Sequence, residues 1–398
     1  MFLEPVDRNA HYRERRRRAR RRRRLRRLVA GGVLVLLATG AAFVARGTVG
    51  DGDRGEQAAA TKPAKAPSQQ PPRVGPRPAP LQMRGVHVTM ALASIPGKLE
   101  EYLNLPGLNT LELDVKDENG EVGFIPSTVP LAREIGAAKP YYKPRVVMRR
   151  AWAHGVYLVG RIVCFEDPVL AEQRPDLAIH RRDGSVWRNH AGLGWTNPYN
   201  REVWDYLVDL GEAAAKNGFD EIQFDYVRFP SDGDVDAVVY PGKTSTPPGW
   251  VIAGFLHYAS KRLKPLGVRV SADVFGLSAT RDLGIGQVPR RISRYLDAIY
   301  PMVYPSHYAS GEYNLPDPNA APGETVAHSL SDFNRELGGR RTVIIPWLQD
   351  FSYGRTYTLD DLKAQINAAA AARTGGFLLW NAAGIYTADA LLYEPTVG

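Results

Sequence analysis

The chain has 398 residues, 44% hydrophobic and 10% aromatic, so a large core can form and wholesale disorder is excluded. The net charge of +9 arises in the N-terminal part, because residues 1–27 hold thirteen Arg against three acidic residues, and residues 46–82 hold six basic and three acidic residues. The remainder from Met83 onward carries −4, which argues against a nucleic-acid partner for that part. Cys164 is the only cysteine, which excludes an intrachain disulfide and a cysteine-based zinc site.

The N-terminal segment predicts a membrane anchor. Residues 28–45 form an uncharged run that follows the Arg-rich segment 1–27 and precedes Arg46. A helix of this length nearly spans a hydrocarbon core of about 30 Å, and cationic flanks stay on the cytoplasmic side. We therefore expect an uncleaved single-pass signal anchor in the cell membrane, with the N-terminus in the cytoplasm and the rest of the chain extracellular. A cleaved signal peptide and polyanion binding by the Arg segment are the alternatives.

Residues 46–82 are rich in Pro, Ala and polar residues and have no apolar period, so we expect an extended linker. From residue 83 to residue 398, short apolar runs alternate with longer amphipathic stretches, the pattern of strand–helix units around a parallel sheet. This range is predicted to be one catalytic domain, monomeric in solution.

Eight strands and eight helices are expected in this range. The predicted strands are Gly85–Met90, Thr110–Lys116, Tyr157–Asp167, Glu221–Pro230, Arg269–Gly276, Ala298–Pro305, Thr342–Phe351 and Gly375–Ala382. The predicted helices are Ile95–Asn104, Lys143–His154, Asn200–Asn217, Pro248–Lys264, Gln287–Tyr295, Gly323–Leu337, Leu359–Arg373 and Gly384–Leu392. The α/β fold class that fits this count and size is a (β/α)8 TIM barrel. A doubly wound open sheet is the alternative, disfavoured because no G-x-G-x-x-G motif follows the first strand.

Carboxylates are predicted to point into the mouth of this barrel. Side chains two residues apart in a strand share a face, so the apolar positions of three strands are expected to pack against helices and the polar positions to face inward. The residues predicted to face inward are Glu112, Asp114 and Lys116, then Gln223 and Asp225, then Ser271 and Asp273. Because barrel active sites lie at the C-terminal ends of strands, these carboxylates are candidates for chemistry.

Asp225 and Asp273 are predicted to be the catalytic pair of a glycosidase. Glycosidic cleavage needs one carboxyl to protonate the leaving oxygen and another to attack or to activate water. The two residues lie on neighbouring strands, so both can reach one bond. The structural alternative is that each carboxylate caps a helix or pairs with Arg161, Arg228 or Arg269.

Other polar and aromatic residues at strand ends are predicted to bind substrate, because sugar sites combine flat apolar faces with hydrogen-bonding groups. These candidates are His87, Asp114, Glu166, Arg228, Tyr304, Trp347, Gln349, Trp380 and Asn381. No cofactor and no metal are expected, since the chain has no H-E-x-x-H, P-loop or G-x-S-x-G motif.

Two other functions remain open from the residues alone. His87, Asp114 and Asp225 could form the metal site of a polysaccharide deacetylase, whose activity chelation would abolish. Alternatively, the barrel could bind a cell-envelope glycan without cleaving it, with no need for a protonated carboxyl at neutral pH.

Five segments resemble a known family. They are GFDEIQFDYVRFPSDG (218–233), RGVHVT, LNTLELDVKDENGEVGF, SADVFG and YPMVYPSHY. They are similar to a barrel family described as a putative glycosyl hydrolase domain, and the resemblance covers Arg84 to Tyr393. It implies a (β/α)8 fold distantly similar to alpha-amylase-like barrels, in which the strand-four Asp is the nucleophile. On that resemblance the role falls to Asp225.

The chain departs from the amylase-like pattern at the proton donor. That pattern has a Glu at the end of strand five and an Asp after strand seven, whereas this chain has Asp273 and Asp350 at these places. The resemblance therefore leaves the identity of the proton donor open, as it leaves the sugar, the linkage and the stereochemical route.

The predicted anchor can be tested by fractionation. The full chain is expected in the membrane fraction, and external protease is expected to release a folded fragment by cutting within 46–82, where the backbone is exposed. Recovery of the intact chain in the soluble cytoplasmic fraction would contradict this topology.

Overall fold

A computed structural model of the chain describes residues 75–396. The predicted segments 1–27 and 28–45, and most of the predicted linker 46–82, lie outside this range. Between residues 75 and 396, no helix is both long enough and apolar enough to cross a membrane. The compact unit begins at Gly75, ahead of the predicted domain boundary at residue 83.

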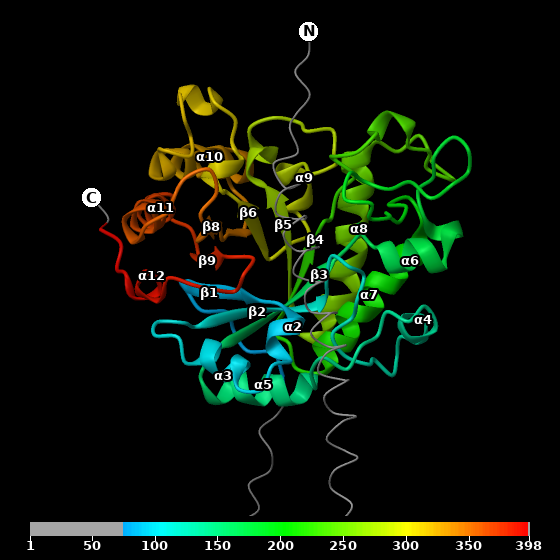
Figure 1. The fold of residues 1–398 in the computed structure, drawn as a ribbon, viewed down its shortest axis with the longest axis horizontal. Helices are drawn as coiled ribbons and strands as arrows, with labels where there is room; N and C mark the ends of the chain where they lie inside the picture. The colour runs from blue at the N-terminus through cyan, green and yellow to red at the C-terminus, as the bar shows by residue number, and fades with distance from the viewer. Residues whose placement is uncertain (1–74, 397–398) are drawn as a thin grey trace, which may run out of the picture. The chain divides into compact units, whose positions relative to one another are not determined.

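The described chain forms a closed barrel of eight parallel strands surrounded by helices (Figure 1). The strands are β1 (Met83–Val88), β2 (Thr110–Lys116), β3 (Tyr157–Val163), β4 (Glu221–Asp225), β5 (Arg269–Phe275), β6 (Ala298–Met302), β7 (Val343–Ile344), β8 (Trp347–Gln349) and β9 (Gly376–Trp380). β1 to β6 pair in parallel in chain order, β6 pairs with both β7 and β8, and β9 pairs with β8 and closes the ring on β1. The barrel confirms the predicted TIM fold and excludes the open-sheet alternative.

β7 and β8 together form the seventh strand of the barrel. β6 pairs with both, and the break falls at Ile345 and Pro346. Proline has no N–H to donate to a ladder, so regular pairing is interrupted there. The surrounding bonds persist, because the Ile345 N–H donates to Ile299 and the Pro346 carbonyl accepts from Leu378. The predicted strand Thr342–Phe351 is therefore present in two parts.

Helices follow most strands and cover the outside of the barrel. They are α2 (Met90–Ala93), α3 (Lys98–Leu103), α4 (Pro130–Glu134), α5 (Pro144–Ala153), α6 (Pro168–Gln173), α7 (Arg201–Lys216), α8 (Pro248–Leu263), α9 (Pro289–Ile292), α10 (Pro322–Leu337), α11 (Leu359–Ala371) and α12 (Ala388–Leu392). The predicted helix Ile95–Asn104 is wrong at its start, because Pro96 disfavours helical backbone at the preceding residue and α3 begins only after Gly97. The short helices α4 and α6 were not predicted.

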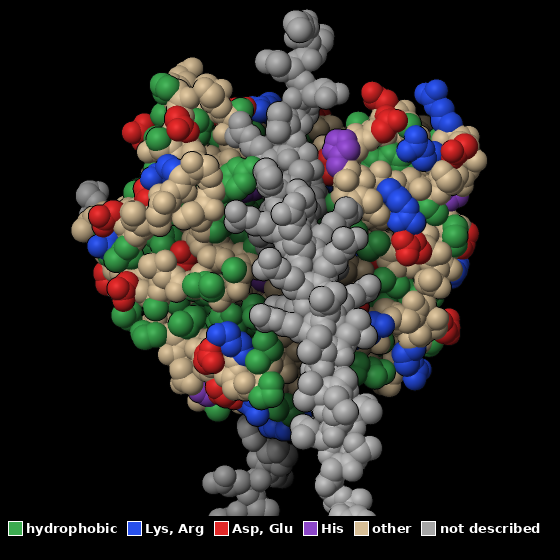
Figure 2. All heavy atoms as spheres, in the orientation of Figure 1, with side chains coloured by type: hydrophobic (Ala, Val, Ile, Leu, Met, Phe, Trp, Pro, Cys, Tyr) green, Lys and Arg blue, Asp and Glu red, His purple; other side chains and the backbone are tan. Residues whose placement is uncertain are grey.

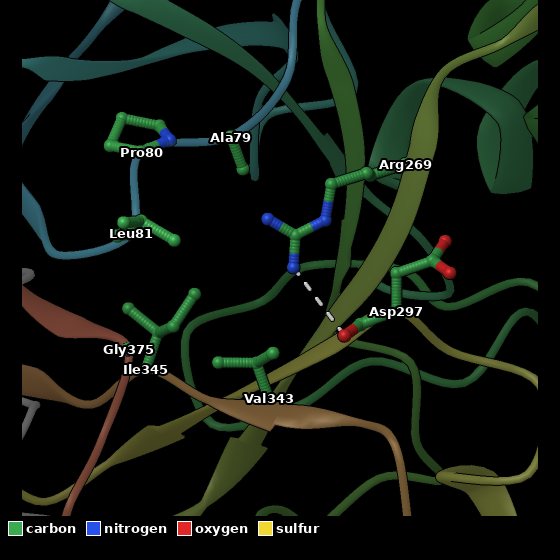
Figure 3. Close-up of a pocket in the computed structure, with 8 residues that line it drawn as sticks. All are labelled: Ala79, Pro80, Leu81, Arg269, Asp297, Val343, Ile345 and Gly375. Atoms are coloured by element: carbon green, nitrogen blue, oxygen red, sulfur yellow. Dashed lines mark hydrogen bonds between the residues drawn. The ribbon is translucent and has the colours of Figure 1, made fainter.

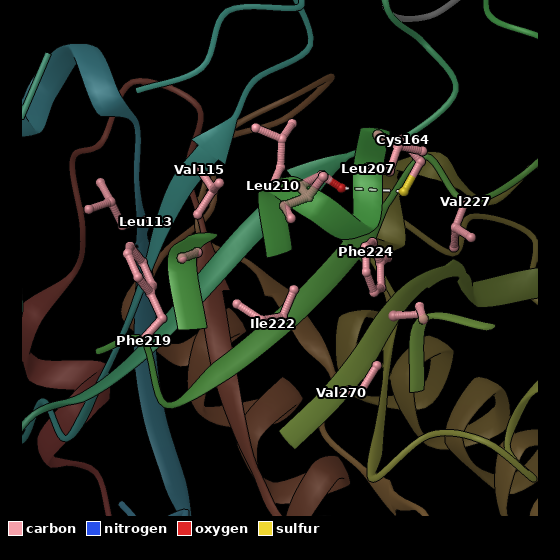
Figure 4. Packing of buried hydrophobic residues seen from close by; sticks show 14 of the residues in the cluster. Leu113, Val115, Cys164, Leu207, Leu210, Phe219, Ile222, Phe224, Val227 and Val270 are labelled. Carbon is pink, nitrogen blue, oxygen red and sulfur yellow. Dashed lines mark hydrogen bonds between the residues drawn. The ribbon is translucent and has the colours of Figure 1, made fainter. Parts of the chain in front are cut away.

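The predicted alternation of faces along the strands is present. The outward residues of β2 and β4, Leu113 and Ile222 among them, are fully buried against the helices. Figure 4 shows this outer core, in which Phe224 and Ile222 lie beside Leu207 and Leu210 of α7. A second, smaller apolar cluster fills the inside of the barrel, formed by Met83, Tyr157, Val159, Ala298, Tyr300, Tyr304, Ile345, Trp347 and Leu378. Asp114, Asp225 and Asp273 therefore lie on the C-terminal side of this cluster.

A short N-terminal strap, residues 75–82, packs onto the barrel before β1 begins. The Arg77 backbone N–H donates to Oδ1 of Asp220 at 2.8 Å, and the Arg77 guanidinium lies 2.7 Å from Oδ2. Asp220 is fully buried just before β4 and also accepts from the Leu158 N–H at 2.9 Å. The predicted linker therefore ends in a segment tied to the N-terminal end of the barrel.

Charges of both signs are interspersed over the visible described surface in Figure 2, without one large patch of either sign. This distribution agrees with the small net charge of the part of the chain from Met83 onward.

Loss of the Arg77 contact is expected to destabilise the barrel. Arg77→Ala leaves the buried Asp220 carboxylate without its cation, and we expect the free energy of unfolding to fall by about 1–3 kcal/mol in urea titrations, less than for a fully buried pair because Arg77 is partly exposed. Arg77→Lys keeps a positive charge and is expected to recover part of the loss. Unchanged stability of Arg77→Ala would show that the strap does not contribute to folding.

Candidate active site

The C-terminal end of the barrel brings together polar side chains from five strands. The registers of the paired strands place them in two successive inward layers. The lower layer consists of His87, Arg161, Asp273 and Trp347, and the upper layer of Asp114, Asp225, Met302 and Trp380. Six of the predicted site residues therefore share one region, together with Arg161, which sequence analysis considered only as a structural partner.

Asp225, the last residue of β4, is held by the side chain of Arg161. The Nη2 and Nε atoms of Arg161 lie 2.6 Å and 3.0 Å from Oδ2 of Asp225. Oδ1 accepts the backbone N–H of Tyr226 at 2.6 Å, and Tyr226 adopts a φ of 49°, a left-handed conformation that a bulky residue rarely takes. Both oxygens are thus held by hydrogen bonds. Asp225 is only 6% exposed.

Arg161 joins two of the predicted site carboxylates. Its Nη1 atom lies 2.8 Å from Oδ1 of Asp114, and its guanidinium lies over the ring of Trp380 at 5.6 Å. Burial opposes the charge on Arg161, but the carboxylates of Asp225 and Asp114 outweigh it and raise the pKa of the guanidinium. Arg161 therefore stays charged and neutralises part of the negative charge in the barrel mouth.

Asp273 on β5 has a different environment. Its Oδ1 atom accepts from Nε2 of Gln223 at 2.5 Å and from Nε1 of Trp347 at 2.7 Å. Burial raises the pKa of the Asp273 carboxyl well above its usual range, and the nearby carboxylates of Asp225 and Glu112 raise it further. A proton retained at neutral pH belongs on Oδ2, because both N–H donors already occupy Oδ1.

His87 and Asp114 lie beside this pair on β1 and β2. Nε2 of His87 is 3.7 Å from Oδ1 of Asp114, and the imidazole is tilted against the ring of Trp380 with centroids 4.6 Å apart. Nδ1 of His87 lies 2.5 Å from Oε2 of Glu112, which is fully buried. Burial raises the pKa of Asp114, whereas His87 and Arg161 lower it. Glu112 was expected to face inward but was not selected as a site residue.

Lys116, which was predicted to face inward on the same strand as Asp114, pairs with a different carboxylate. The pairing of β2 with β3 shifts register between Asp114 and Lys116. The Lys116 amine instead lies 3.0 Å from the Asp167 carboxylate and donates to the Val163 carbonyl at 2.7 Å. The cation beside Asp114 is Arg161, from the neighbouring strand.

Glu166 and Arg228 lie in the loops above the strands. Oε2 of Glu166 accepts from Nδ2 of Asn189 at 2.8 Å, and both side chains are buried. The Arg228 guanidinium is about 5 Å from three ring centroids, those of Trp195, Tyr226 and Phe275. Arg228 therefore packs within an aromatic cluster beside the mouth, and a role in substrate binding stays a prediction for both residues.

Gln349 and Asn381 use their amide groups to hold loops. Oε1 of Gln349 accepts from the Ser306 N–H at 3.0 Å, and its Nε2 donates to the Phe351 carbonyl at 2.9 Å. Asn381 donates to the Asp350 carbonyl and accepts from the Ala383 N–H. These bonds shape the mouth, and direct contact of either residue with substrate stays a prediction.

Asp350, which follows the seventh strand, binds Thr387 in the loop after β9. Its carboxylate accepts from the N–H and the hydroxyl of Thr387 at 2.7 Å and 2.8 Å. Burial raises the pKa of Asp350 to about 6, although these two hydrogen bonds lower it.

The three aromatic candidates differ in how deeply they are buried. Tyr304 and Trp347 are buried in the inner apolar cluster, whereas Trp380 is partly exposed beside them. The rings of Trp347 and Trp380 are nearly perpendicular, with centroids 5.6 Å apart. Trp380 therefore presents the more accessible flat surface.

Within residues 75–396, no three His, Cys, Asp or Glu side chains are arranged to hold a metal ion. The proposed deacetylase ligands Asp114 and Asp225 are instead bridged by Arg161. A guanidinium between two carboxylates competes with a divalent cation for the same oxygens, so these side chains do not fit the metal-site alternative.

A cavity of about 340 Å³ lies at the opposite end of the barrel, where the strands begin (Figure 3). It is lined by Ala79, Pro80, Leu81, Arg269, Asp297, Val343, Ile345 and Gly375. Arg269 and Asp297 are the only charged groups in this lining, and Arg269 donates weakly to the Asp297 carbonyl. The clustered carboxylates lie at the mouth, away from this cavity.

Comparison with family models places residues 85–386 in the family described as a putative glycosyl hydrolase domain. The chain belongs to this family. Membership confirms the resemblance seen in the sequence and the assignment of the chain as a glycosyl hydrolase of the kind the family describes. A comparison with curated proteins found no match.

Solved structures share the barrel of this glycosyl hydrolase family member. The PgaB (BpsB) glycoside hydrolase domain from Bordetella bronchiseptica is 13% identical, with a TM-score of 0.54 over 75% of this chain and 94% of that one. The C-terminal domain of a putative chitinase from Desulfitobacterium hafniense DCB-2 is 10% identical, with a TM-score of 0.50 over 78% and 96%. At these identities the likeness concerns the fold.

A hypothetical protein from Ruminiclostridium thermocellum ATCC 27405 is 36% identical over 48% of this chain and 97% of its own, with a TM-score of 0.43. That structure has no stated activity to compare with the site of this glycosyl hydrolase family member.

The raised pKa of Asp273 predicts how stability depends on pH. The folded chain keeps this proton at pH values where the unfolded chain, with an aspartate pKa of about 3.9, has lost it. The folded state then binds more protons, so this group makes the free energy of unfolding fall as the pH rises from about 4 toward the raised pKa. Asp273→Asn mimics the protonated carboxyl. Its free energy of unfolding, measured by urea titration, is expected to fall less steeply than that of the wild type between pH 4 and pH 8.

The exposed Asp360 at the start of α11 provides a control, because Asp360→Asn should leave the slope unchanged. An Asp273→Asn variant with the wild-type slope would show that Asp273 is ionised in the folded chain.

Proposed function

We propose that the domain hydrolyses glycosidic bonds of a polysaccharide with Asp225 and Asp273 as its catalytic carboxyl groups. The observation that carries the proposal is their unequal environment: Asp225 is paired with Arg161, whereas burial and neighbouring carboxylates raise the pKa of Asp273. Glycosidases need one ionised and one protonated carboxyl at the same bond. Family membership supports the reaction class.

In this proposal Asp273 is the general acid. Its Oδ2 proton passes to the glycosidic oxygen as the bond from that oxygen to the anomeric carbon breaks. Trp347 and Gln223 orient the carboxyl through Oδ1 and so keep Oδ2 available. Trp347 therefore acts by positioning the acid, because it is buried beneath the mouth.

Asp225 acts at the anomeric carbon of the bond that is cleaved. Its carboxylate attacks the anomeric carbon or removes a proton from the attacking water, and in either route it stabilises the oxocarbenium-like transition state. Arg161 orients Asp225 through two hydrogen bonds to Oδ2. The partly exposed face of Trp380 is proposed to bind a sugar ring, with His87 and Asp114 beside it to bind hydroxyl groups.

We further propose that the domain acts outside the cytoplasm, anchored by residues 28–45 and linked through residues 46–82. The Arg-rich flank and the length of the apolar run support this arrangement. The strap contacts the N-terminal end of the barrel, and the carboxylate cluster lies at the other end. On this proposal the mouth faces away from the point where the linker joins the domain.

Asp225→Asn is expected to abolish hydrolysis while the barrel stays folded. The substitution keeps the shape of the side chain and removes the charge, so turnover on a polysaccharide panel should fall by several orders of magnitude with little change in melting temperature. Azide rescue of Asp225→Gly would assign the nucleophile role and a retaining route.

Asp273→Asn is expected to affect substrates unequally. Substrates with good leaving groups need little protonation and should be cleaved comparatively well. Asp360→Asn, on the exposed start of α11, serves as the control with unchanged turnover. Glycan cleavage that survives Asp225→Asn would contradict the assignment, and glycan binding without cleavage by the wild type would favour a binding barrel.

A further inference from the structure

Glu112 is a buried carboxyl that the catalytic scheme above does not use. It lies on β2 with its side chain directed into the barrel, one layer below His87 and Arg161. The residue is 0% exposed, so a substrate at the mouth cannot touch it. It shares its layer with Gln223, Tyr300 and Leu378, as the strand registers show.

The Glu112 carboxyl is only partly satisfied by hydrogen bonds. Oε2 lies 2.5 Å from Nδ1 of His87, whereas Oε1 has no hydrogen-bond partner within the part of the chain that the structure describes. Burying a carboxyl costs several kcal/mol unless it is well paired, and apolar replacements at such positions are often neutral or stabilising. Folding stability alone therefore does not explain a Glu at this position.

We propose that Glu112 is a positioning residue of the hydrolytic site, which holds His87 through Nδ1 so that Nε2 is directed toward Asp114. This inference rests on the proposed hydrolase function. The face of the imidazole also lies against the ring of Trp380. The hydroxyl of Tyr386 donates to the backbone carbonyl of His87 and so fixes the backbone there. Neither of these contacts involves Nδ1, which is the ring atom that lies against Glu112.

The orientation of His87 matters because Nε2 is the ring nitrogen that faces Asp114, a proposed substrate-binding residue. Nε2 lies 3.7 Å from Oδ1 of Asp114, the same oxygen that accepts from Nη1 of Arg161. Arg161 in turn holds Asp225. Glu112 is thus connected through His87 to the group that binds sugar hydroxyls, without contacting the substrate itself.

The charged groups around Glu112 come from four strands. His87 faces it from β1, Asp114 lies on its own strand, Arg161 faces it from β3, and Asp225 and Glu221 face it from β4. Burial raises the pKa of Glu112, and Arg161 lowers it. Glu112 also acts on Asp273 of β5, since the Glu112 charge raises the pKa of that acid.

Glu112→Leu and Glu112→Gln in the full chain separate positioning from a structural role. Glu112→Leu removes the contact to Nδ1, so kcat should fall by roughly 10-fold or more, by analogy with the loss of side chains that orient metal-bound histidines, with KM less affected. The melting temperature should stay level or rise, because a buried carboxyl becomes apolar. Glu112→Gln keeps an oxygen that accepts from Nδ1–H and should recover most of the activity.

Two comparisons complete the test. In a His87→Gln background, Glu112→Leu should have little further effect on kcat, because the two residues act as one unit. Glu221→Gln is the matched control, since Glu221 is also buried in the barrel but binds the hydroxyls of Tyr157 and Tyr300 near its base. This control should lower stability and leave kcat of the folded enzyme unchanged.

Nitrogen-15 NMR of the histidine rings in the substrate-free full chain tests the contact without any assay of hydrolysis. The wild type should show His87 with a protonated, hydrogen-bonded Nδ1, and Glu112→Leu should lose this signal. Failure of the proposed function would appear as absent hydrolysis with this NMR result intact. The inference is overturned if the Nδ1 signal is the same in Glu112→Leu, or if that variant loses stability while keeping wild-type kcat.

Discussion

The guanidinium of Arg161 is the interaction on which the site depends. It lies between the carboxylates of Asp114 and Asp225 and bonds to both, in a space too confined for two unpaired anions. Burial raises the pKa of Asp114, and the Arg161 charge opposes that rise. Arg161 thereby gives the nearby carboxyls different surroundings: Asp114 and Asp225 each bond to the guanidinium, whereas Asp273 is held by Gln223 and Trp347, and burial raises its pKa well above the usual range.

The cost of burying these groups is met by the apolar core outside the barrel. Residues of β2 and β4 alternate, so that every inward carboxylate has outward Leu, Ile or Phe neighbours packed against α7 and α8 (Figure 4). Parallel strands place all their C-terminal ends at one rim, which is why side chains distant in the sequence converge there. The strained turn at Tyr226 and the register shift after Asp114 both lie at this rim, where backbone irregularity commonly accompanies function.

Much of the fold could be predicted because its signals are local. The period-2 pattern gave both ends of β2, and the facing of Asp114 and Asp225 followed from the same alternation. The sequence could not reveal the partner of each charge, which depends on the register between strands. Lys116, for example, was predicted to face inward with Asp114 but pairs with Asp167. Glu112 was noted as inward but passed over, because only the structure shows that it contacts His87.

The protonation state of Asp273 is the most direct test of this account. Carbon-13 NMR of aspartate-labelled protein at pH 7 should show a protonated side-chain carboxyl that disappears in Asp273→Asn. That result would establish an acid beside the Arg161-bound Asp225 before any substrate is known. Full ionisation of the Asp273 carboxyl at pH 7 would contradict the account, because neither carboxyl of the pair could then donate a proton to a glycosidic oxygen.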